Sequence, residues 1–414
     1  MFKKIIITIS IFIALFFLIK KYQDTVYLFS LSIKNYIPSI IDTTLRVVFN
    51  HEKYSKKINN DYNTVFLPET QFKELDFKKI KLNFITPNIS GYNKRKKTRS
   101  FFIETNKNNL FMVSSNGKLF FSKLNDINND KYNFEEKSYK INKKDSLLRV
   151  TDLNIYKDKI IISRVIKINK CHYLVLDQAD ITNKNFEFKE IFKSKTCEKA
   201  INAGKVEAIS ENKILLTTAT SPTGNREEKD PDSQNDSSIF GKVLLINTDT
   251  LKYKVYSKGH RNSLGLLVDG DYILSTENGP KGGDEINLEI EGKNYGWDIA
   301  SYGVNYKKTK IYLDHEKLKF KEPIFAFVPS IGISEIIKLG NNFAEEWQDN
   351  YLIGSLNYLQ LLRVKLNEEK SKVLFIEKIF IGERIRDLVY DSENKIILLA
   401  LENSGSLGIL KAKN

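Results

Sequence analysis

A short phrase of polar and apolar residues recurs six times along the chain. Each copy opens with a polar residue, continues as an apolar run dominated by Ile and Leu, and ends on a small residue. The copies lie at residues 109–114, 159–163, 213–218, 271–276, 350–355 and 395–400. Continuous apolar runs favour strands that are covered on both faces. We therefore expect six similar inner strands, each packed between neighbouring sheets.

The repetition predicts a β-propeller. A propeller blade has four strands and takes roughly 40 to 50 residues, with insertions falling in its loops. Six copies therefore predict a six-bladed β-propeller over residues 75–414, with almost no long helix. A pair of packed sheets can also repeat strands, but it does not require one phrase in six copies.

The N-terminal residues follow a different pattern. Residues 5–19 are almost wholly apolar, with two lysines on each side. The core of a signal peptide has about 7 to 15 apolar residues and a membrane span roughly 20. The nearest small-residue cleavage site, at residues 30–32, lies far downstream. We favour an uncleaved signal anchor, a membrane-anchor helix at residues 1–21, over a removed signal peptide, and its orientation stays open because both flanks are basic.

Composition adds little to this all-β interpretation. Residues 22–74 fit neither pattern, and we interpret them as a stalk or linker. The net charge is +14, yet the lysines are spread along the chain and only residues 94–99 form a dense basic cluster. A broad excess of lysine is non-specific, so we expect a solvated loop and no nucleic-acid partner.

The two cysteines bear on the cellular compartment. Cys171 opens one strand-like run and Cys197 follows the next. If these runs are successive antiparallel strands, the sulfur atoms can come close enough for a disulfide, which an exported domain would keep. Two buried thiols are the alternative.

The segment at residues 277–287, followed by Asn-Tyr-Gly-Trp at residues 294–297, is dense in glycine and carboxylates. Glycine at this density excludes a packed helix and lets the backbone turn sharply. Such a loop offers carbonyl and carboxylate oxygens, the ligands that Ca²⁺ prefers.

Together with Gly-His-Arg-Asn at residues 259–262, this segment resembles the soluble quinoprotein sugar dehydrogenases, the glucose/sorbosone dehydrogenase family. The family pattern reads Glu-His-Gly-Pro-x-Gly-Gly-Asp-Glu-Leu/Ile-Asn and then Asn-Tyr-Gly-Trp. The resemblance covers residues 202–412, about half of the chain. It implies a six-bladed propeller, the quinone PQQ (pyrroloquinoline quinone) held by Ca²⁺ and basic side chains, and oxidation of an aldose sugar.

The resemblance also implies roles for particular residues. Arg261 matches the arginine at the developing oxyanion, with Asn262 as its neighbour. The matched cofactor and metal positions are Arg384 and Arg386 for the quinone, the carbonyls of Gly279 and Pro280 for its calcium, and Glu285 and Tyr295 for a second, structural calcium. Arginines at positions i and i+2 of a strand share one face, so both can meet one anion.

Several positions depart from the family pattern, among them Asn278, where the family has histidine. The catalytic histidine of His-x-x-Gly-Arg corresponds to Ile201, in a segment that ends at Lys205, and isoleucine accepts no proton. The expected glutamine is Leu264 and the expected lysine is Asn357. Loss of a general base costs about 10² to 10⁴ in rate. Among the four histidines, His315 is the first to consider as a substitute base.

Two functions stay open. One is a membrane-anchored quinoprotein that faces the periplasm or the extracellular side and oxidises an aldose or related carbohydrate with PQQ and calcium. The other is a catalytically inactive propeller, a pseudoenzyme that binds a carbohydrate or an envelope partner.

Overall fold

The computed structural model describes residues 74–85, 100–128, 133–137, 146–182, 186–196, 201, 203–220, 232–304, 312–313 and 315–413. The chain splits into two compact units, and all of these residues belong to the unit that comprises Thr64–Asn88 and Lys96–Asn414. The predicted anchor at residues 1–21 and nearly all of the predicted stalk lie outside the described residues. Within the described residues no helix has the length and apolar character to cross a membrane.

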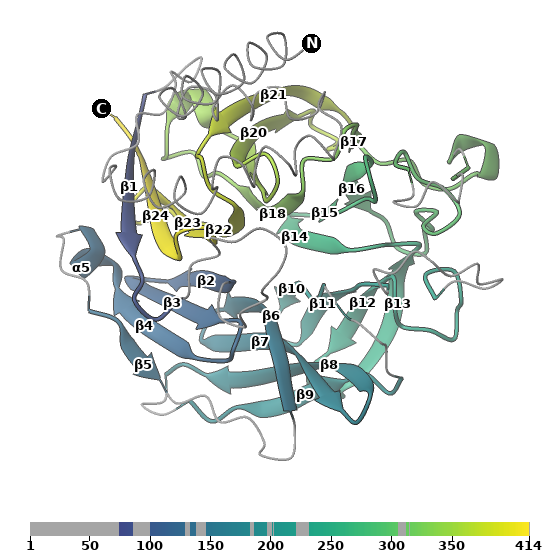
Figure 1. Cartoon of the computed structure of the whole chain (residues 1–414), viewed down its shortest axis with the longest axis horizontal. Coiled ribbons are helices and arrows are strands. Elements are labelled where there is room, and N and C mark those ends of the chain that lie inside the picture. Colours follow the sequence, from purple (N-terminus) through teal and green to yellow (C-terminus); the bar gives the residue numbers. More distant parts are fainter. Residues whose placement is uncertain are drawn as a thin grey trace, which may run out of the picture. The chain divides into compact units, whose positions relative to one another are not determined.

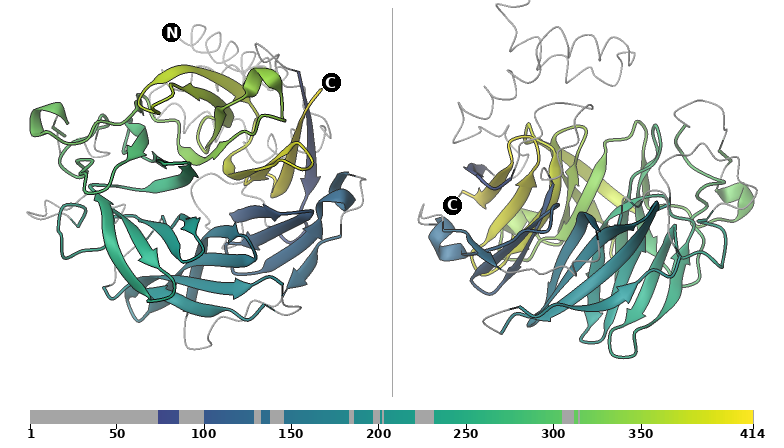
Figure 2. Two further views of the ribbon diagram at one scale, coloured as in Figure 1. Left: turned by 180° about the vertical axis from the view of Figure 1, so that it is seen from behind. Right: turned by 60° about the horizontal axis from the view of Figure 1, so that its bottom comes forward.

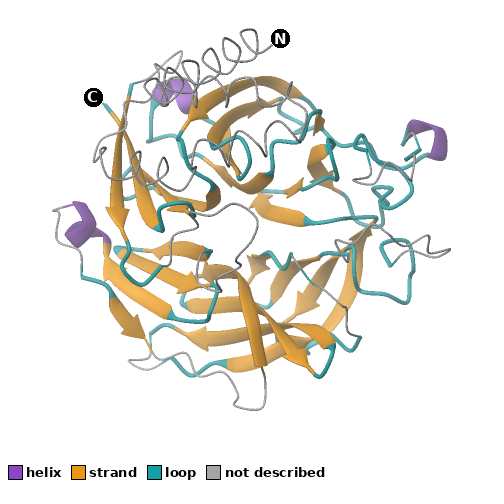
Figure 3. Ribbon diagram, in the orientation of Figure 1, coloured by secondary structure: helices purple, strands orange, loops and turns teal. Residues whose placement is uncertain are grey.

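The described residues form six antiparallel sheets of four strands each, so the predicted six-bladed β-propeller is confirmed (Figures 1 and 3). The first three blades consist of β2 (Phe101–Asn106), β3 (Asn109–Ser114), β4 (Leu119–Lys123) and β5 (Glu135–Lys137); β6 (Ser146–Tyr156), β7 (Lys159–Ile168), β8 (Cys171–Asp180) and β9 (Lys189–Lys193); and β10 (Val206–Ser210), β11 (Lys213–Thr218), β12 (Lys242–Asn247) and β13 (Lys252–Lys258).

The fourth and fifth blades consist of β14 (Ser263–Asp269), β15 (Tyr272–Glu277), β16 (Asp284–Glu289) and β17 (Phe325–Phe327), and of β18 (Ile333–Lys338), β19 (Asn350–Ser355), β20 (Gln360–Leu366) and β21 (Val373–Phe380). The sixth joins β22 (Ile385–Asp391), β23 (Ile396–Leu401) and β24 (Ser406–Ala412) to β1 (Leu75–Lys81). Helical residues are few in the described part: α5 (Leu124–Asn128), η2 (Glu316–Leu318) and η3 (Glu345–Trp347).

The first strand of each blade lies nearest the axis. Strands β2, β6, β10, β14, β18 and β22 each contact the next in this order, and β22 contacts β2 again. This closed ring of inner strands surrounds the axis of the propeller (Figure 2). Side chains of the inner strands therefore meet at the axis although they come from distant parts of the sequence.

The ring is closed by strands from both ends of the propeller sequence. β1 pairs antiparallel with β24, from Leu75 opposite Ala412 to Lys81 opposite Ser406. β1 buries side chains on both of its faces, because Phe77 (1% exposed) and Ile80 (5% exposed) belong to two different apolar clusters. The sixth blade is thus complete only when the first described strand joins it.

The recurring phrase marks the second strand of every blade, namely β3, β7, β11, β15, β19 and β23. These strands are buried on both faces; in β23 all six residues are buried, and Leu398 and Leu399 are fully enclosed in two different apolar clusters. The innermost strands do not show the phrase because they direct polar side chains at the axis and carry β-bulges, for example between Ile385 and Asp387. The strands that the phrase predicts as innermost are therefore the second strands of their blades, counted outward from the axis.

Cys171 begins β8 and is disulfide-bonded. The sequence contains two cysteines, and the other, Cys197, lies outside the described residues.

Candidate functional site

Four of the predicted site residues lie where inner strands begin. Arg261 and Asn262 directly precede β14, Arg384 directly precedes β22, and Arg386 is the second residue of β22. Every blade repeats one strand order and the inner strands contact one another around the ring, so these starts share one face of the propeller. We call this the upper face.

Hydrogen bonds connect the arginines of the upper face. Arg261 donates from Nη1 to the carbonyl of Asn278 at 2.7 Å, and Asn278 donates from Nδ2 to the carbonyl of Ile333 at 2.5 Å. Arg384 donates from Nη1 to the carbonyl of Leu356 at 2.7 Å. The N–H of Leu356 in turn donates to the carbonyl of Gly332, which directly precedes Ile333. The starts of blades four, five and six are therefore joined at the predicted site.

Arg261 is held by both halves of the glycine-rich motif. Its backbone N–H donates to Oε1 of Glu277 at 2.5 Å. Its guanidinium carbon lies 5.4 Å from the centroid of the Trp297 ring, within the range of a cation–π contact. The residue that the resemblance assigns to the oxyanion is thus held by Glu277 at its backbone and by Trp297 at its side chain.

The neighbouring His260 is a buried cation. Nδ1 lies 2.9 Å from Oε2 of Glu277, and Nε2 lies 3.4 Å from Oε2 of Glu289. Burial by itself would lower the pKa of His260, but Glu289 and Glu277 outweigh it and raise the pKa to about 10. The ring also stacks on Tyr295, with centroids 4.7 Å apart. His260 is fully engaged in this network and is no proton acceptor for a substrate.

The loop after β15 depends on glycine at two positions. A Cβ on Gly279 would lie 2.0 Å from the carbonyl oxygen of Gly283, and Gly283 has φ +72°. The Asp284 carboxylate accepts hydrogen bonds from the N–H groups of Gly279 at 2.9 Å, Gly332 at 2.7 Å and Ile333 at 3.0 Å. These three hydrogen bonds hold the loop after β15 against blade five.

Glu285 lies directly opposite Glu277 in the register of β15 and β16. Like charges at such a pair destabilise a sheet. Burial, and then the charge of Glu277, raise the pKa of Glu285 well above its usual range. Oδ1 of the adjacent Asn287 is buried without a hydrogen-bond partner, while the Tyr295 hydroxyl accepts from Ile290 N–H at 3.0 Å. The group therefore presents oxygen atoms that a cation would satisfy.

The two arginines of blade six share one carboxylate. Arg384 Nε donates to Oε2 of Glu402 at 2.9 Å, and Arg386 Nε donates to Oε1 of the same group at 2.7 Å. Burial opposes it, but Arg386 and Arg384 hold the pKa of Glu402 well below its usual range. The arginine side chains are 30% and 18% exposed, so a ligand can still reach them. Within the chain, both arginines thus bind the same carboxylate, that of Glu402.

The positions that depart from the family pattern are varied in burial. Ile201 is fully buried and packs in an apolar cluster with Phe240 and Leu244 of blade three. Leu264 is half-buried in β14 and Asn357 is exposed after β19. His315 is 2% exposed and stacks on Tyr302, with centroids 5.1 Å apart. The burial of Ile201 and His315 gives neither position direct access to a substrate.

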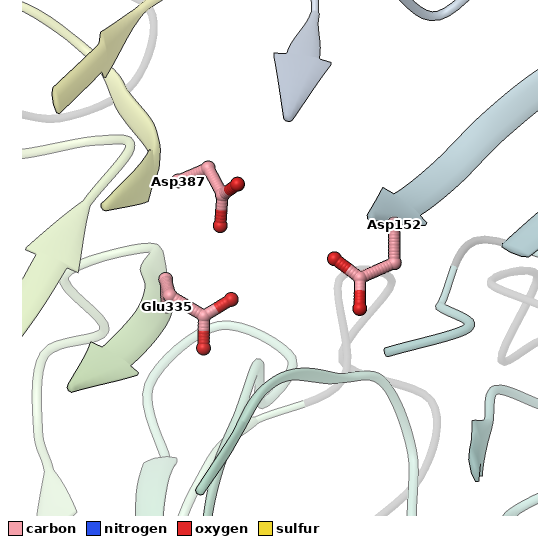
Figure 4. Close-up of side chains that lie close together, drawn as sticks. All are labelled: Asp152, Glu335 and Asp387. Carbon is pink, nitrogen blue, oxygen red and sulfur yellow. The ribbon is translucent and has the colours of Figure 1, made fainter. Parts of the chain in front are cut away.

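A second group of charges lies at the axis. The carboxylates of Asp152 (β6), Glu335 (β18) and Asp387 (β22) point toward one another, with oxygen atoms within 4.8 Å (Figure 4). The Lys205 ammonium, from the residue before β10, lies 2.5 Å from Asp152 and 3.4 Å from Asp387 and also contacts Glu335. A lysine therefore occupies the place that these three carboxylates could offer to a metal ion.

Two carboxyls near Lys205 have raised pKa values. Burial, countered by Lys205, raises the pKa of Asp152 to about 7, and the same causes raise that of the neighbouring Glu207 to about 8. The sequence did not reveal this cluster, because its members come from four blades. The one local signal was Lys205, a lysine directly before the inner strand β10.

Comparisons with known proteins agree with this geometry. The glucose / sorbosone dehydrogenase family model matches residues 168–409. The aldose sugar dehydrogenase YliI of Escherichia coli (strain K12) is 29% identical over 178 residues, which are 41% of this chain and 47% of that protein. The chain thus spans about half the length of the curated relatives it matches.

Two solved structures share the fold. The soluble aldose sugar dehydrogenase from Escherichia coli in the apo-form superposes with a TM-score of 0.66 at 17% identity, covering 82% of this chain and 99% of that one. The PQQ-bound aldose sugar dehydrogenase from Streptomyces coelicolor gives 0.54 at 16% identity, covering 81% and 98%.

The six-bladed ring and the glycine-rich loop beside Arg261 define a propeller of the quinoprotein sugar dehydrogenase-like class. With more than half of its length matched by the family model, the chain belongs to the glucose/sorbosone dehydrogenase family, as a divergent member.

Proposed function

We propose that this protein binds PQQ and an aldose or related carbohydrate on the upper face and oxidises the carbohydrate. The observation that carries the proposal is the arginine arrangement: Arg261, Arg384 and Arg386 are joined through hydrogen bonds at the starts of the inner strands. Arginine forks are suited to carboxylates. PQQ, when bound, supplies the acceptor for the hydride of the sugar.

The residues of the upper face fit such a cofactor. Glu402 takes Nε of both Arg384 and Arg386, and Leu356 takes Nη1 of Arg384. Among the described residues this leaves Nη2 of Arg384 and both Nη atoms of Arg386 to meet an anionic ligand. Oδ1 of Asn262 is buried without a partner among the described residues. Arg261, fixed on Trp297, would stabilise negative charge on the sugar oxygen.

Calcium fits the residues of the glycine-rich motif. We propose that Gly279 and Pro280 offer backbone carbonyls to one ion and that Glu285, near Tyr295, binds a structural ion. Support comes from the opposed carboxylates Glu277 and Glu285 and from the unpartnered oxygen of Asn287. A cation would compensate the like charges that the register brings together.

The second candidate function is a catalytically inactive propeller that binds a carbohydrate or an envelope partner. The observation that favours it is Ile201, which is fully buried at the position of the expected base. Without a proton acceptor there, hydride departure from the sugar is disfavoured.

One experiment on the purified full-length chain separates these functions. Calorimetry with PQQ and calcium tests cofactor binding, and aldose oxidation with an artificial electron acceptor tests turnover. Binding that is weakened by Arg386→Gln, but not by Lys395→Gln outside the site, supports the proposed site. Binding without turnover supports the inactive propeller, and no binding of PQQ refutes the quinoprotein function.

We further propose that the protein is held in the membrane by residues 1–21, with the propeller on the periplasmic or extracellular side. The disulfide at Cys171 supports an oxidising compartment. The apolar run at residues 5–19 supports the anchor. Fractionation of cells tests the anchor, and protease treatment of intact cells and of spheroplasts tests the orientation. Protection of the propeller from added protease in spheroplasts as well as in intact cells would refute the orientation.

A further inference from the structure

The arginine pair of the upper face is supported by one turn. Residues 402–405 connect β23 to β24, and the turn begins with Glu402, which binds Nε of both Arg384 and Arg386. The backbone N–H of Glu402 also donates to the carbonyl of Arg384 at 2.9 Å. Any shift of this turn therefore moves the carboxylate that orients both guanidinium groups.

A second buried carboxylate fixes the other end of the turn. Oε2 of Glu383 accepts hydrogen bonds from the N–H of Ser404 at 3.0 Å and from its hydroxyl at 2.8 Å. Glu383 directly precedes Arg384, so it connects the turn to the arginine through the backbone as well.

Lys79 of the closing strand β1 neutralises Glu383. Its ammonium lies 3.0 Å from Oε1 of Glu383, and the two side chains are 6% and 1% exposed. An ion pair this deeply buried is strongly disturbed when one partner is removed. β1 thus contributes a charge to the turn besides its backbone pairing with β24.

Other residues that precede the first blade contact the same turn. The N–H of Leu82 donates to the carbonyl of Gly405 at 3.0 Å, and the Ser100 hydroxyl donates to Oε1 of Glu402 at 2.5 Å. The support of the arginine pair is therefore assembled from the two ends of the propeller sequence (Figure 1).

We propose that Lys79 is a positioning residue for the ligand site: through Glu383 and the turn at residues 402–405 it sets the orientation of Arg384 and Arg386. This inference rests on the proposed function, in which these arginines bind an anionic cofactor. The alternative is that Lys79 serves ring closure alone, in which case its loss lowers stability and leaves the arginines unchanged.

The test compares Lys79→Met with Lys81→Met, a control that removes an exposed lysine from the same strand. The first measurement is the rate at which phenylglyoxal modifies Arg384 and Arg386, followed by peptide mass spectrometry, which requires no cofactor. We expect faster modification in Lys79→Met, rates like those of the unmodified protein in Lys81→Met, and recovery in Lys79→Arg.

The second measurement is the affinity for PQQ by calorimetry, where we expect a loss of about tenfold or more in Lys79→Met, as for the loss of charge-assisted hydrogen bonds. Ser404→Ala removes one hydrogen bond of Glu383. It should raise the modification rate and lower the affinity for PQQ, each by less than Lys79→Met does. This variant replaces Lys79→Met in the test if Lys79→Met does not fold. Unchanged arginine reactivity in a destabilised Lys79→Met protein would overturn the inference. Failure of the unmodified protein to bind PQQ would refute the proposed function, while the modification rates still decide the role of Lys79.

Discussion

The imidazole of His260 lies between Glu277 and Glu289 and is shielded from solvent. Glu277 also accepts the backbone N–H of Arg261, so the charge on His260 helps to fix the arginine. A histidine beside the arginine of the proposed site invites assignment as a base, yet here both ring nitrogens are engaged. Its role at the residue scale is that of a buried counter-ion.

We predict that His260→Gln lowers the free energy of unfolding by about 3 to 5 kcal/mol near pH 6, because two buried carboxylates lose their cation. The folded-state pKa of His260 is raised to about 10 from a usual 6.5. This contribution is present below pH 6.5 and is lost as the pH rises through 10. Denaturant unfolding should therefore show a difference in unfolding free energy between the unmodified protein and His260→Gln that becomes smaller as the pH rises from 6 to 10.

The matched control is His172→Gln, which changes a partly exposed histidine of β8 and should shift stability far less. A gap for His260→Gln that stays constant over this pH range would contradict a charged His260.

At the scale of elements, the hairpin of β15 and β16 combines a glycine-rich loop with two carboxylates placed face to face. The loop was predictable from sequence, because Gly279 and Gly283 act locally through their lack of a Cβ. The hydrogen bonds of Asp284 were not predictable from sequence, because its partners Gly332 and Ile333 belong to the next blade. Local chemistry can be read from a motif, whereas the partner of a side chain depends on packing.

We predict that calcium raises the thermal unfolding temperature and that a chelator lowers it. Calcium at 100 times its dissociation constant would add about 2.7 kcal/mol by mass action. Glu285→Gln should reduce this shift, whereas Glu291→Gln, on the exposed turn after β16, should not. Because burial raises the pKa of Glu285, calcium must displace a proton from it, so binding should strengthen as the pH rises.

Differential scanning calorimetry of the full-length chain, with and without chelator, measures the effect. The same unfolding temperature with calcium and with chelator would show that the folded protein binds no calcium, and would contradict the proposed calcium sites.

At the scale of the whole molecule, the six blades are joined at the axis by charge as well as by apolar packing. Lys205 of blade three contacts carboxylates of blades two, five and six. The number of blades was predictable, because the second strand of each is buried on both faces and carries the phrase. The axial cluster was not, because bulges around residues such as Asp152 and Glu335 break the alternation from which the face of a side chain is deduced.

We predict that Lys205→Met costs about 3 to 5 kcal/mol of unfolding free energy at pH 8 and clearly less at pH 5. Carboxyls with raised pKa values, about 7 for Asp152 and about 8 for Glu207, stabilise the fold below about pH 4 and lose that contribution as the pH rises to about 8. Without the Lys205 ammonium, the carboxylates that ionise at pH 8 repel one another with no cation between them. At pH 5 these carboxyls are protonated, so the repulsion is absent and the substitution costs less.

Denaturant unfolding of the variant and of Lys213→Met, which alters an exposed lysine of β11, measures the difference. Equal losses at pH 5 and pH 8 would show that the lysine acts through packing and not through charge.

The pairing of β1 with β24 has a consequence for the order in which the protein can be made. A ribosome releases β1 among the first strands of the propeller and β24 last, so Phe77 stays uncovered until the final blade emerges. The nascent chain must therefore carry an unpaired strand edge for nearly the whole of synthesis. Protection of that edge during elongation, by a chaperone or by rapid release of the C-terminal residues, becomes a requirement of the architecture.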